Sequence, residues 1–458
     1  MLERLLDAIK SSRADYADIR LERSFITSVA WRGRRLEGAS TGTDVGGTVR
    51  CLNHGHGWGV ATFNRLDDLE ARLSRAHDLS LSVRPPEPVV LAPAPVREGQ
   101  VRAAPTDDPR DIPLLEKRRY LEHLNGEMLR FDRRIIDTQA AYRDEVTECW
   151  FVNSDGTALH ELRPDVTLSA LAVARDGGVL ERAVESLGAR GGWTRVRDQE
   201  ELFRTAARRA VSLLDAKPVR SGSFPVILDP RLAGVVAHET VGHLCEADTQ
   251  LEDPVAAALA APGRRLGSEL LTIGDDGSVV GLRGTLPFDD EGTPPSNTLL
   301  VQHGVVVGRL HSRETAARFG ERPTGNARAI SFRHVPLVRL TNTYVANGSG
   351  TFADLIRDVK LGVYACDAVG SRHRGDGYSF TAGHGYMIRD GAIAEPVKSV
   401  VLVGFVTELL GAVDRVAGDF RWHESGGGCG KAGQSPLPVS EGAPHVRLRS
   451  AEIRGQAP

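Results

Sequence analysis

The sequence predicts an α+β protein of two domains, and three observations support this prediction. Its 458 residues are more than one hydrophobic core normally supports. Runs that alternate between apolar and polar residues, as strands do, occur before and after clear helical patterns. Residues 217–224 contain proline, glycine and serine directly after a well-patterned helix, which is typical of a boundary. We therefore expect an N-terminal α/β domain over residues 1–218 and a C-terminal β-rich domain over residues 219–458.

The first half of the N-terminal domain has the pattern of helices on a curved antiparallel sheet. Residues 1–10 alternate apolar and charged positions as an amphipathic helix does, and the helical spacing returns at residues 66–83. Between them, residues 17–41 and 46–63 look like strands joined by glycine-rich turns. The five prolines within residues 84–100 cannot continue a helix or lie in a central strand, so this segment is predicted to be a long surface connection.

The second half of this domain repeats the mixture. Residues 113–130 are helical in pattern, and residues 135–178 alternate as two strands around the turn signal at residues 153–156. Residues 200–216 then have the pattern of a further amphipathic helix. Helices and antiparallel strands are thus expected throughout the first domain.

The C-terminal domain is predicted to be mostly antiparallel sheet around one helix. A short strand begins at residue 224 and leads into a helix that extends to about residue 248. Some two hundred glycine-rich residues follow, with β-type runs such as residues 334–346 and 399–406. The helix carries the most unusual motif of the sequence.

Composition limits the class of protein. Hydrophobic residues make up 41% and charged residues 26%, and no apolar stretch approaches the ~20 residues that span a bilayer. The N-terminus lacks the pattern of a secretory signal, so we expect a cytoplasmic protein. A net charge of -3 argues against a nucleic-acid binder. The five cysteines are widely spaced and odd in number, which is unlike a disulfide framework.

The unusual motif is VVAHETVGHLCEAD, residues 235–248, in which His238 and His243 are five residues apart. On a regular α-helix their side chains would diverge by ~140°, because each residue advances ~100°. A π-bulge would absorb one residue and return both imidazoles to one face, and Gly242 supplies backbone freedom for it. The alternative is a straight helix with His238 in the core and His243 in solvent. The spacing alone leaves both open.

A catalytic zinc ion takes three protein ligands, so a third donor would have to come from elsewhere. Cys245 is more simply a small core residue. Cys429 lies among glycines in WHESGGGCGKAGQ, a context that favours a ligand. If these residues hold a metal, Glu239, beside His238, is the natural general base; without a metal it is a helix-surface acid. The full set of candidate third ligands is Glu246, Asp248, Cys245, His423, Glu424 and Cys429.

These residues resemble the TldD/PmbA family of metallopeptidases, and in particular its metal-bearing TldD-type subunit. The resemblance runs in order through most of the chain, in DYADIRLERS, HETVGHLCEAD, FDDEGTPPSNTLLVQHGVVVGRL, PTGNARAISFRHVPLVRLTNTY, GYSFTAGHGYMIRDGAI and CGKAGQSPLPV. The family pattern of His-Glu, three residues, His and a distant Cys-Gly-Lys-x-Gly-Gln matches His238, Glu239, His243 and Cys429. It implies zinc ligation by the two histidines and the cysteine, and the base role for Glu239.

The resemblance also implies what the protein does. It implies a zinc-dependent peptidase (Zn2+ as cofactor) that hydrolyses peptides or unfolded segments through a metal-bound water. It further implies a dimer, formed with a TldE (PmbA)-like subunit or with a second copy of the chain. Extended peptides bound through main-chain hydrogen bonds would fit a low sequence specificity.

Two weaker motifs remain. In RLTNTY, the side chains of Arg339, Thr341 and Asn342 suit the anchoring of a peptide backbone or carboxylate, although strand residues can equally face solvent. We predict a substrate contact for these three because of the family resemblance. The acidic DDEG of residues 289–292 could bind a cation or an amine, but such clusters are mostly turns.

Two other classes of function compete with the peptidase. The chain could be a peptide-binding or regulatory partner protein whose metal serves structure. It could also be a nucleic-acid-associated regulator, an idea suggested only by the family's older name as modulators of DNA gyrase. The near-neutral charge and the absence of a long basic tract weigh against the latter.

Overall fold

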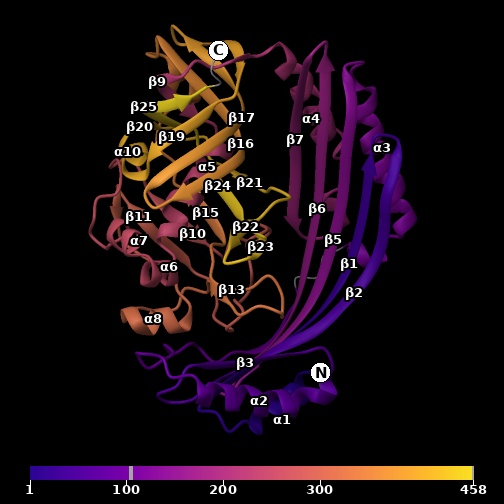
Figure 1. Ribbon diagram of the computed structural model, residues 1–458, viewed down its shortest axis with the longest axis vertical. Coiled ribbons are helices and arrows are strands. Elements are labelled where there is room, and N and C mark those ends of the chain that lie inside the picture. Colours follow the sequence, from indigo (N-terminus) through magenta and orange to yellow (C-terminus); the bar gives the residue numbers. More distant parts are fainter. Residues whose placement is uncertain (103–106, 456–458) are drawn as a thin grey trace.

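The computed structural model describes residues 1–102 and 107–455. Its N-terminal part is a long curved sheet (Figure 1). Its order is β3-β2-β1-β5-β6-β4, and β7 pairs with a later stretch of β6, on the same edge as β4. Neighbours run antiparallel except for β4 on β6, which is parallel. The strands are β1 (Tyr16–Arg32), β2 (Arg35–Leu52), β3 (Trp58–Phe63), β4 (Glu98–Arg102), β5 (Ile135–Asn153), β6 (Ala158–Asp176) and β7 (Val179–Arg190).

Helices cover one face of this sheet at its two ends (Figure 1). Side chains along a strand point alternately to the two faces of the sheet, and the helices cover the apolar face. On β6, Val166, Leu168 and Ala170 are fully buried on that face, while the residues between them are only half-buried. The buried side chains belong to a core with α3 (Leu114–Phe131) and α4 (Glu200–Asp215). A second core forms under α1 (Leu2–Lys10) and α2 (Leu69–Ser82). The predicted helices and curved antiparallel sheet are confirmed.

The C-terminal part contains a small barrel that the sequence did not reveal. Strand β16 pairs with both β9 and β17, which closes the ring β16-β9-β25-β19-β17. Strands β8 and β18 extend the sheet beyond β17, and β20 pairs with β25. The bounds are β8 (Lys217–Pro218), β9 (Gly222–Leu228), β16 (Leu361–Arg374), β17 (Gly377–Arg389), β18 (Ala392–Lys398), β19 (Val401–Phe405), β20 (Val413–Val416) and β25 (Val446–Arg454).

A six-stranded sheet of order β12-β11-β10-β15-β24-β21 completes this part. Helix α5 (Pro230–Ala237) packs against strands of both this sheet and the barrel, and Leu232, Ala233 and Val236 join the largest hydrophobic core. The sheet comprises β10 (Ile273–Asp276), β11 (Asn297–Gln302), β12 (Val305–Val306), β15 (Asn342–Val345), β21 (Arg421–His423) and β24 (Ser440–Ala443).

Short elements connect these units. Two small hairpins are built from β13 (Ala327–Arg328) with β14 (Leu337–Val338), and from β22 (Cys429–Lys431) with β23 (Gln434–Leu437). The remaining α-helices of the described chain are α6 (Ala247–Glu252), α7 (Pro254–Leu259), α8 (Arg313–Phe319), α9 (Phe352–Ile356) and α10 (Val406–Gly411). None of the helices in the described ranges is long and apolar enough to cross a membrane. The boundary at residue 218 stays a prediction.

Buried ion pairs join the curved sheet to the C-terminal part. Asp290 is buried and lies 2.8 Å from Nη1 of Arg20 on β1 and 3.0 Å from Nη1 of Arg163 on β6. Burial raises the pKa of Asp290, but the two guanidinium groups outweigh it and lower the pKa to about 2. The DDEG segment does turn at Gly292, and its three carboxylates are buried: Asp290 and Glu291 pair with arginines, and Asp289 accepts backbone hydrogen bonds.

Replacing Asp290 by alanine should destabilise the fold. The substitution leaves two buried guanidinium groups short of a carboxylate, and breaking buried pairs in this way costs about 3 kcal/mol or more. Urea denaturation of Asp290→Ala should therefore show a lower free energy of unfolding. The matched control is Glu395→Ala, which removes an exposed pair with Arg389 and should leave stability nearly unchanged. Equal stability of the two variants would contradict this role for Asp290.

Candidate metal centre

The helix that carries the histidines starts as a capped α-helix and then widens. The Asp229 side chain accepts a hydrogen bond from the Leu232 backbone N–H, and Pro230 occupies the first turn, which together favour a helix start here. After Ala237 the backbone makes a π-helical turn over residues 238–242. This turn absorbs the additional residue between the histidines. The straight-helix alternative is therefore wrong for this chain.

The π-turn brings the two histidines together. The ring centres of His238 and His243 lie 5.1 Å apart, with their planes at 88°. Cys429 approaches from the β22–β23 hairpin, and its Sγ lies 3.4 Å from Nε2 of His243. The ligand atoms of all three residues lie within 4.8 Å of one another. Two imidazole nitrogens and one sulfur at this spacing fit the tetrahedral donor set that zinc prefers.

The electrostatics of the three side chains favour a bound cation. Burial raises the pKa of the Cys429 thiol, but hydrogen bonds from His238 and His243 outweigh burial and lower the pKa to about 5. Burial lowers the pKa of His238, and its interaction with Cys429 outweighs this and raises it to about 9. A buried thiolate is thus held beside two protonated rings. A divalent cation can replace those protons, as metal binding to such groups generally does.

A network of charged groups holds His243 at Nδ1, the ring nitrogen that does not face Cys429. Its Nδ1 lies 2.9 Å from Oε2 of Glu246, which also accepts a hydrogen bond of 3.1 Å from Nζ of Lys431. The same ammonium group donates to Asp248 at 2.6 Å. Burial raises the pKa of Glu246, but His243 and Lys431 outweigh it and lower the pKa to about 2. A carboxylate on the second nitrogen is the usual way to orient a metal-binding imidazole.

Five of the candidate third ligands take other places. Glu246 and Asp248 hold His243 and Lys431, as described above. Cys245 is fully buried in the hydrophobic core, as its neighbours suggested, and burial raises its pKa to about 12. Glu424 pairs with Arg195 at 3.0 Å. His423 lines a nearby cavity, and it lies outside the compact group of ligand atoms.

Glu239 is held beside His238 by a neighbouring strand. Its Oε1 accepts a hydrogen bond of 3.0 Å from the Ser371 hydroxyl of β16. Nδ1 of His238 is buried without a hydrogen-bond partner and lies 3.8 Å from Oε1 of Glu441. Glu441 in turn lines a cavity of about 510 Å³, whose wall also includes Val235 and His384. The cavity therefore reaches Glu441, the carboxylate that faces Nδ1 of His238.

Family models match almost the whole chain. The PmbA/TldA metallopeptidase C-terminal domain matches residues 221–455, the central domain residues 107–214 and domain 1 residues 17–80. The chain belongs to the PmbA/TldD metallopeptidase family. It is 38% identical to the metalloprotease slr0863 of Synechocystis, over 97% of this chain and 96% of that protein. It is 27% identical to the zinc metalloprotease TldD homolog of Saccharolobus solfataricus, over 96% of this chain and 97% of that protein.

Solved structures agree in fold with this PmbA/TldD family member. TldE from Thermococcus kodakarensis superposes with a TM-score of 0.80 at 18% identity, over 99% of this chain and 100% of that one. A protein from Thermotoga maritima superposes with a TM-score of 0.80 at 20% identity, over 99% of each chain. At this level of identity the agreement establishes the fold alone.

The three residues of the RLTNTY motif are buried, and one of them, Arg339, contacts the backbone of the candidate centre. Nη2 of Arg339 donates to the Cys429 carbonyl at 2.9 Å. The Thr341 hydroxyl donates to Asp275, and the Asn342 side chain bonds to the loop before β11. All three are at most 2% exposed. Their contact with substrate stays a prediction, whereas their contacts within the fold place Arg339 against the strand that carries Cys429.

Sequence reasoning missed three residues of the centre, Lys431, Ser371 and Glu441. Lys431 follows Cys429 by two positions in the same strand, and side chains spaced by two share a face, so this spacing was an available signal. Ser371 comes from β16, far away in the sequence, and only barrel closure brings it to Glu239.

Replacing Glu246 by glutamine should weaken metal binding without removing a ligand. Glutamine keeps the shape and an oxygen acceptor, but it loses the charge that holds His243 and Lys431. Loss of such an orienting carboxylate typically lowers metal affinity about 10–100-fold. Competition with a chromogenic zinc chelator measures the affinity. Unchanged affinity would show that Glu246 does not position His243.

Proposed function

We propose that this protein is a zinc-dependent peptidase that hydrolyses peptides or unfolded protein segments. In this proposal His238, His243 and Cys429 hold the ion, and Glu239 is the general base. The observation that carries the proposal is the convergence of the three ligand atoms within 4.8 Å, produced by the π-helical turn. The relatives named metalloproteases, one of them a zinc metalloprotease, support it.

The choice of zinc follows from the donors. Imidazole nitrogen and thiolate sulfur suit zinc, whereas magnesium and calcium take oxygen ligands. Three protein ligands leave a fourth tetrahedral position, which is the arrangement of catalytic rather than structural zinc sites. A bound zinc ion would supply Lewis acidity, which activates water and polarises a peptide carbonyl.

Glu239 would transfer the proton of the attacking water. Glu239 lies directly beside His238, and the Ser371 hydroxyl fixes one of its oxygens. The free oxygen can accept a proton from the attacking water and pass it to the leaving amine. Burial raises the pKa of the neighbouring Glu441, with His238 opposing. Because Glu441 faces Nδ1 of His238 at 3.8 Å, we assign it the positioning of that imidazole and assign the base role to Glu239.

The assembly is also part of the proposal. We infer a dimer, with a TldE-like subunit or with a second copy of this chain, because a protein named TldE shares the fold over its full length. Mass measurement of the purified chain alone distinguishes the two: a dimer of identical chains supports self-association. A monomer would require that a second gene product be present for full activity.

Glu239→Gln should abolish hydrolysis and keep the metal. Glutamine can accept the Ser371 hydrogen bond but cannot accept a proton, and loss of a general base typically costs about 10²–10⁴-fold in rate. The measurement is cleavage of an unstructured, fluorescence-quenched peptide, with zinc content determined on the same sample. Ser371→Ala is the matched control and should lower the rate much less, because it affects only the position of Glu239.

The binding-protein alternative gives a different result. If the metal served structure alone, the wild type would bind the peptide without cleaving it, and Glu239→Gln would behave like the wild type. Chelation of zinc would then lower stability but remove no activity.

A further inference from the structure

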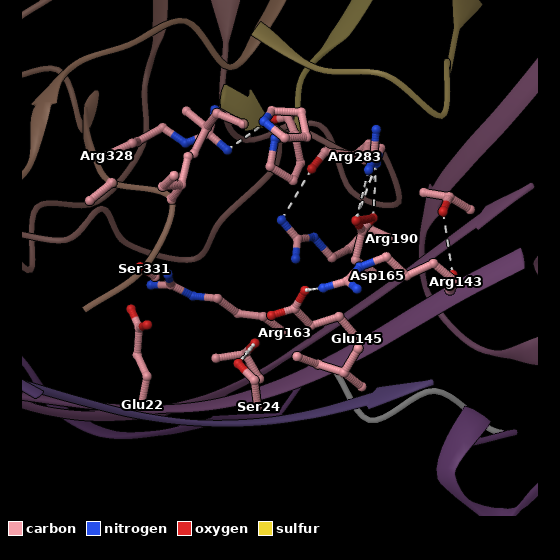
Figure 2. Close-up of a pocket in the computed structure, with 18 of the residues that line it drawn as sticks. Glu22, Ser24, Arg143, Glu145, Arg163, Asp165, Arg190, Arg283, Arg328 and Ser331 are labelled. Atoms are coloured by element: carbon pink, nitrogen blue, oxygen red, sulfur yellow. Dashed lines mark hydrogen bonds and ion pairs between the residues drawn. The ribbon is translucent and has the colours of Figure 1, made fainter. Parts of the chain in front are cut away.

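A cavity of about 440 Å³ lies between the curved sheet and the C-terminal part of the molecule (Figure 2). Glu22, Ser24 and Arg163 extend into it from the sheet, while Arg283 and Arg328 reach it from the opposite wall. Nothing in the proposed peptide hydrolysis uses this space. Its wall is dominated by arginine and acidic side chains, with apolar groups such as Ile26, Leu286, Ile330 and Leu437 among them.

Most of the charges on this wall neutralise one another. Nη2 of Arg143 lies 2.8 Å from Glu145, and Nε of Arg283 lies 2.9 Å from Asp165. Arg163 pairs with Asp290, as described for the fold. The two other acids of the wall also have partners: Glu22 pairs with Arg20, and Asp44 pairs with Arg333. Every carboxylate that lines the cavity is thus already matched to a cation.

Two arginines of the wall have no such match. Among the described residues, no carboxylate forms an ion pair with Arg190 or with Arg328. Arg190, half-buried on β7, donates only to the Arg283 carbonyl, at 3.1 Å, and its buried Nε has no partner. Arg328 is 2% exposed and donates to the carbonyls of Leu340 and Pro438, and its Nε is also unpartnered.

Unpaired guanidinium groups at a cavity wall are costly, because burial without a counter-ion disfavours a charge. Burial, together with the nearby charge of Arg190, lowers the pKa of Arg328 to about 9, and burial lowers the pKa of Arg190 to about 10. Between them the wall offers an unpartnered Nε–H donor on each arginine and two guanidinium groups without a direct ion pair. A planar anion would accept hydrogen bonds from these N–H donors and balance the guanidinium charge.

We propose that this cavity is a binding site for a peptide carboxylate, which Arg190 and Arg328 take up as their missing counter-ion. The apolar part of the wall suits the aliphatic portion of a peptide better than a small inorganic anion. The source of the carboxylate is the C-terminus of the peptide or an acidic side chain. The choice of a peptide as its carrier rests on the proposed function, whereas the anion site itself rests on the two arginines.

The site adjoins the strand that carries Cys429. Pro436 and Leu437 line the cavity, and Leu437 is the pairing partner of Cys429 in the β22–β23 hairpin. Gly426 lines this cavity, while Gly427 lines the cavity that reaches Glu441. The hairpin that carries Cys429 therefore forms part of the wall of the proposed site. Anchoring there would orient the chain with respect to the zinc ligands.

Binding of three versions of one short unstructured peptide tests the site. The first has a free C-terminal carboxylate and no Asp or Glu, the second is its C-terminal amide, and the third is the amide with one internal Glu. Fluorescence anisotropy of N-terminally labelled peptides measures Kd on zinc-loaded Glu239→Gln protein, which removes the proposed base. We expect the Kd of the free acid to be lower than that of the amide by a factor of about ten or more, because the amide loses one charge-assisted interaction.

Introducing Arg190→Gln, and separately Arg328→Gln, into this protein should abolish the difference between acid and amide. Arg143→Gln is the matched control: it lines the same cavity but has Glu145 as its partner, so the preference should persist. Tight binding of the third peptide would show that an acidic side chain also serves, and weak binding would restrict the site to C-termini. Thermal melting confirms that the variants are folded.

Equal Kd values for acid and amide, a preference that survives in both arginine variants, or no binding of any peptide would overturn the proposal. Failure of the proposed function looks different. In that case the wild type cleaves no peptide, while the acid still binds more tightly than the amide and the preference still depends on Arg190.

Discussion

The additional residue between His238 and His243 is the constraint on which the centre depends. A regular helix would turn one imidazole away, so both can meet only if the backbone widens into a π-turn. The surroundings hold that turn in place. The Thr240 hydroxyl donates to the Val236 carbonyl, and a Cβ added at Gly242 would lie 2.2 Å from the side chain of buried Leu340. Glycine is therefore needed where the widened helix meets the core.

The second half of the centre comes from a different part of the chain. Cys429 lies on a two-stranded hairpin that would be unstable alone. Arg339 donates to its backbone carbonyl, and Lys431 connects the same strand to Glu246 and Asp248 beside His243. One buried ion network thus fixes the relative positions of helix and hairpin. Because this network orients the ligands before any metal arrives, little reorganisation would be required on binding.

The sequence predicted much of this arrangement, and its failures have physical causes. Helical periodicity and strand alternation located the helices and long strands of the first part, since these patterns are local. The cysteine at position 429 could be selected from six candidates through its glycine-rich context and the family resemblance. Closure of the barrel could not be foreseen, because it requires β16 to pair with the distant β9 and β17. For the same reason Ser371 escaped notice, and the sequence predicted a turn at residues 289–292 without the buried pairs that Asp290 and Glu291 form with arginines far away in the chain.

The central claim is that His238, His243 and Cys429 form one three-ligand zinc site. Elemental analysis of the purified wild type, His243→Ala, Cys429→Ala and Cys245→Ala tests it most directly. Cys245 is the matched control, because it is a buried cysteine close to His243 in sequence that lies in the hydrophobic core. The account predicts one zinc ion per chain in the wild type and in Cys245→Ala, and loss of zinc in the other two. Zinc absent from the wild type, or retained without Cys429, would contradict it.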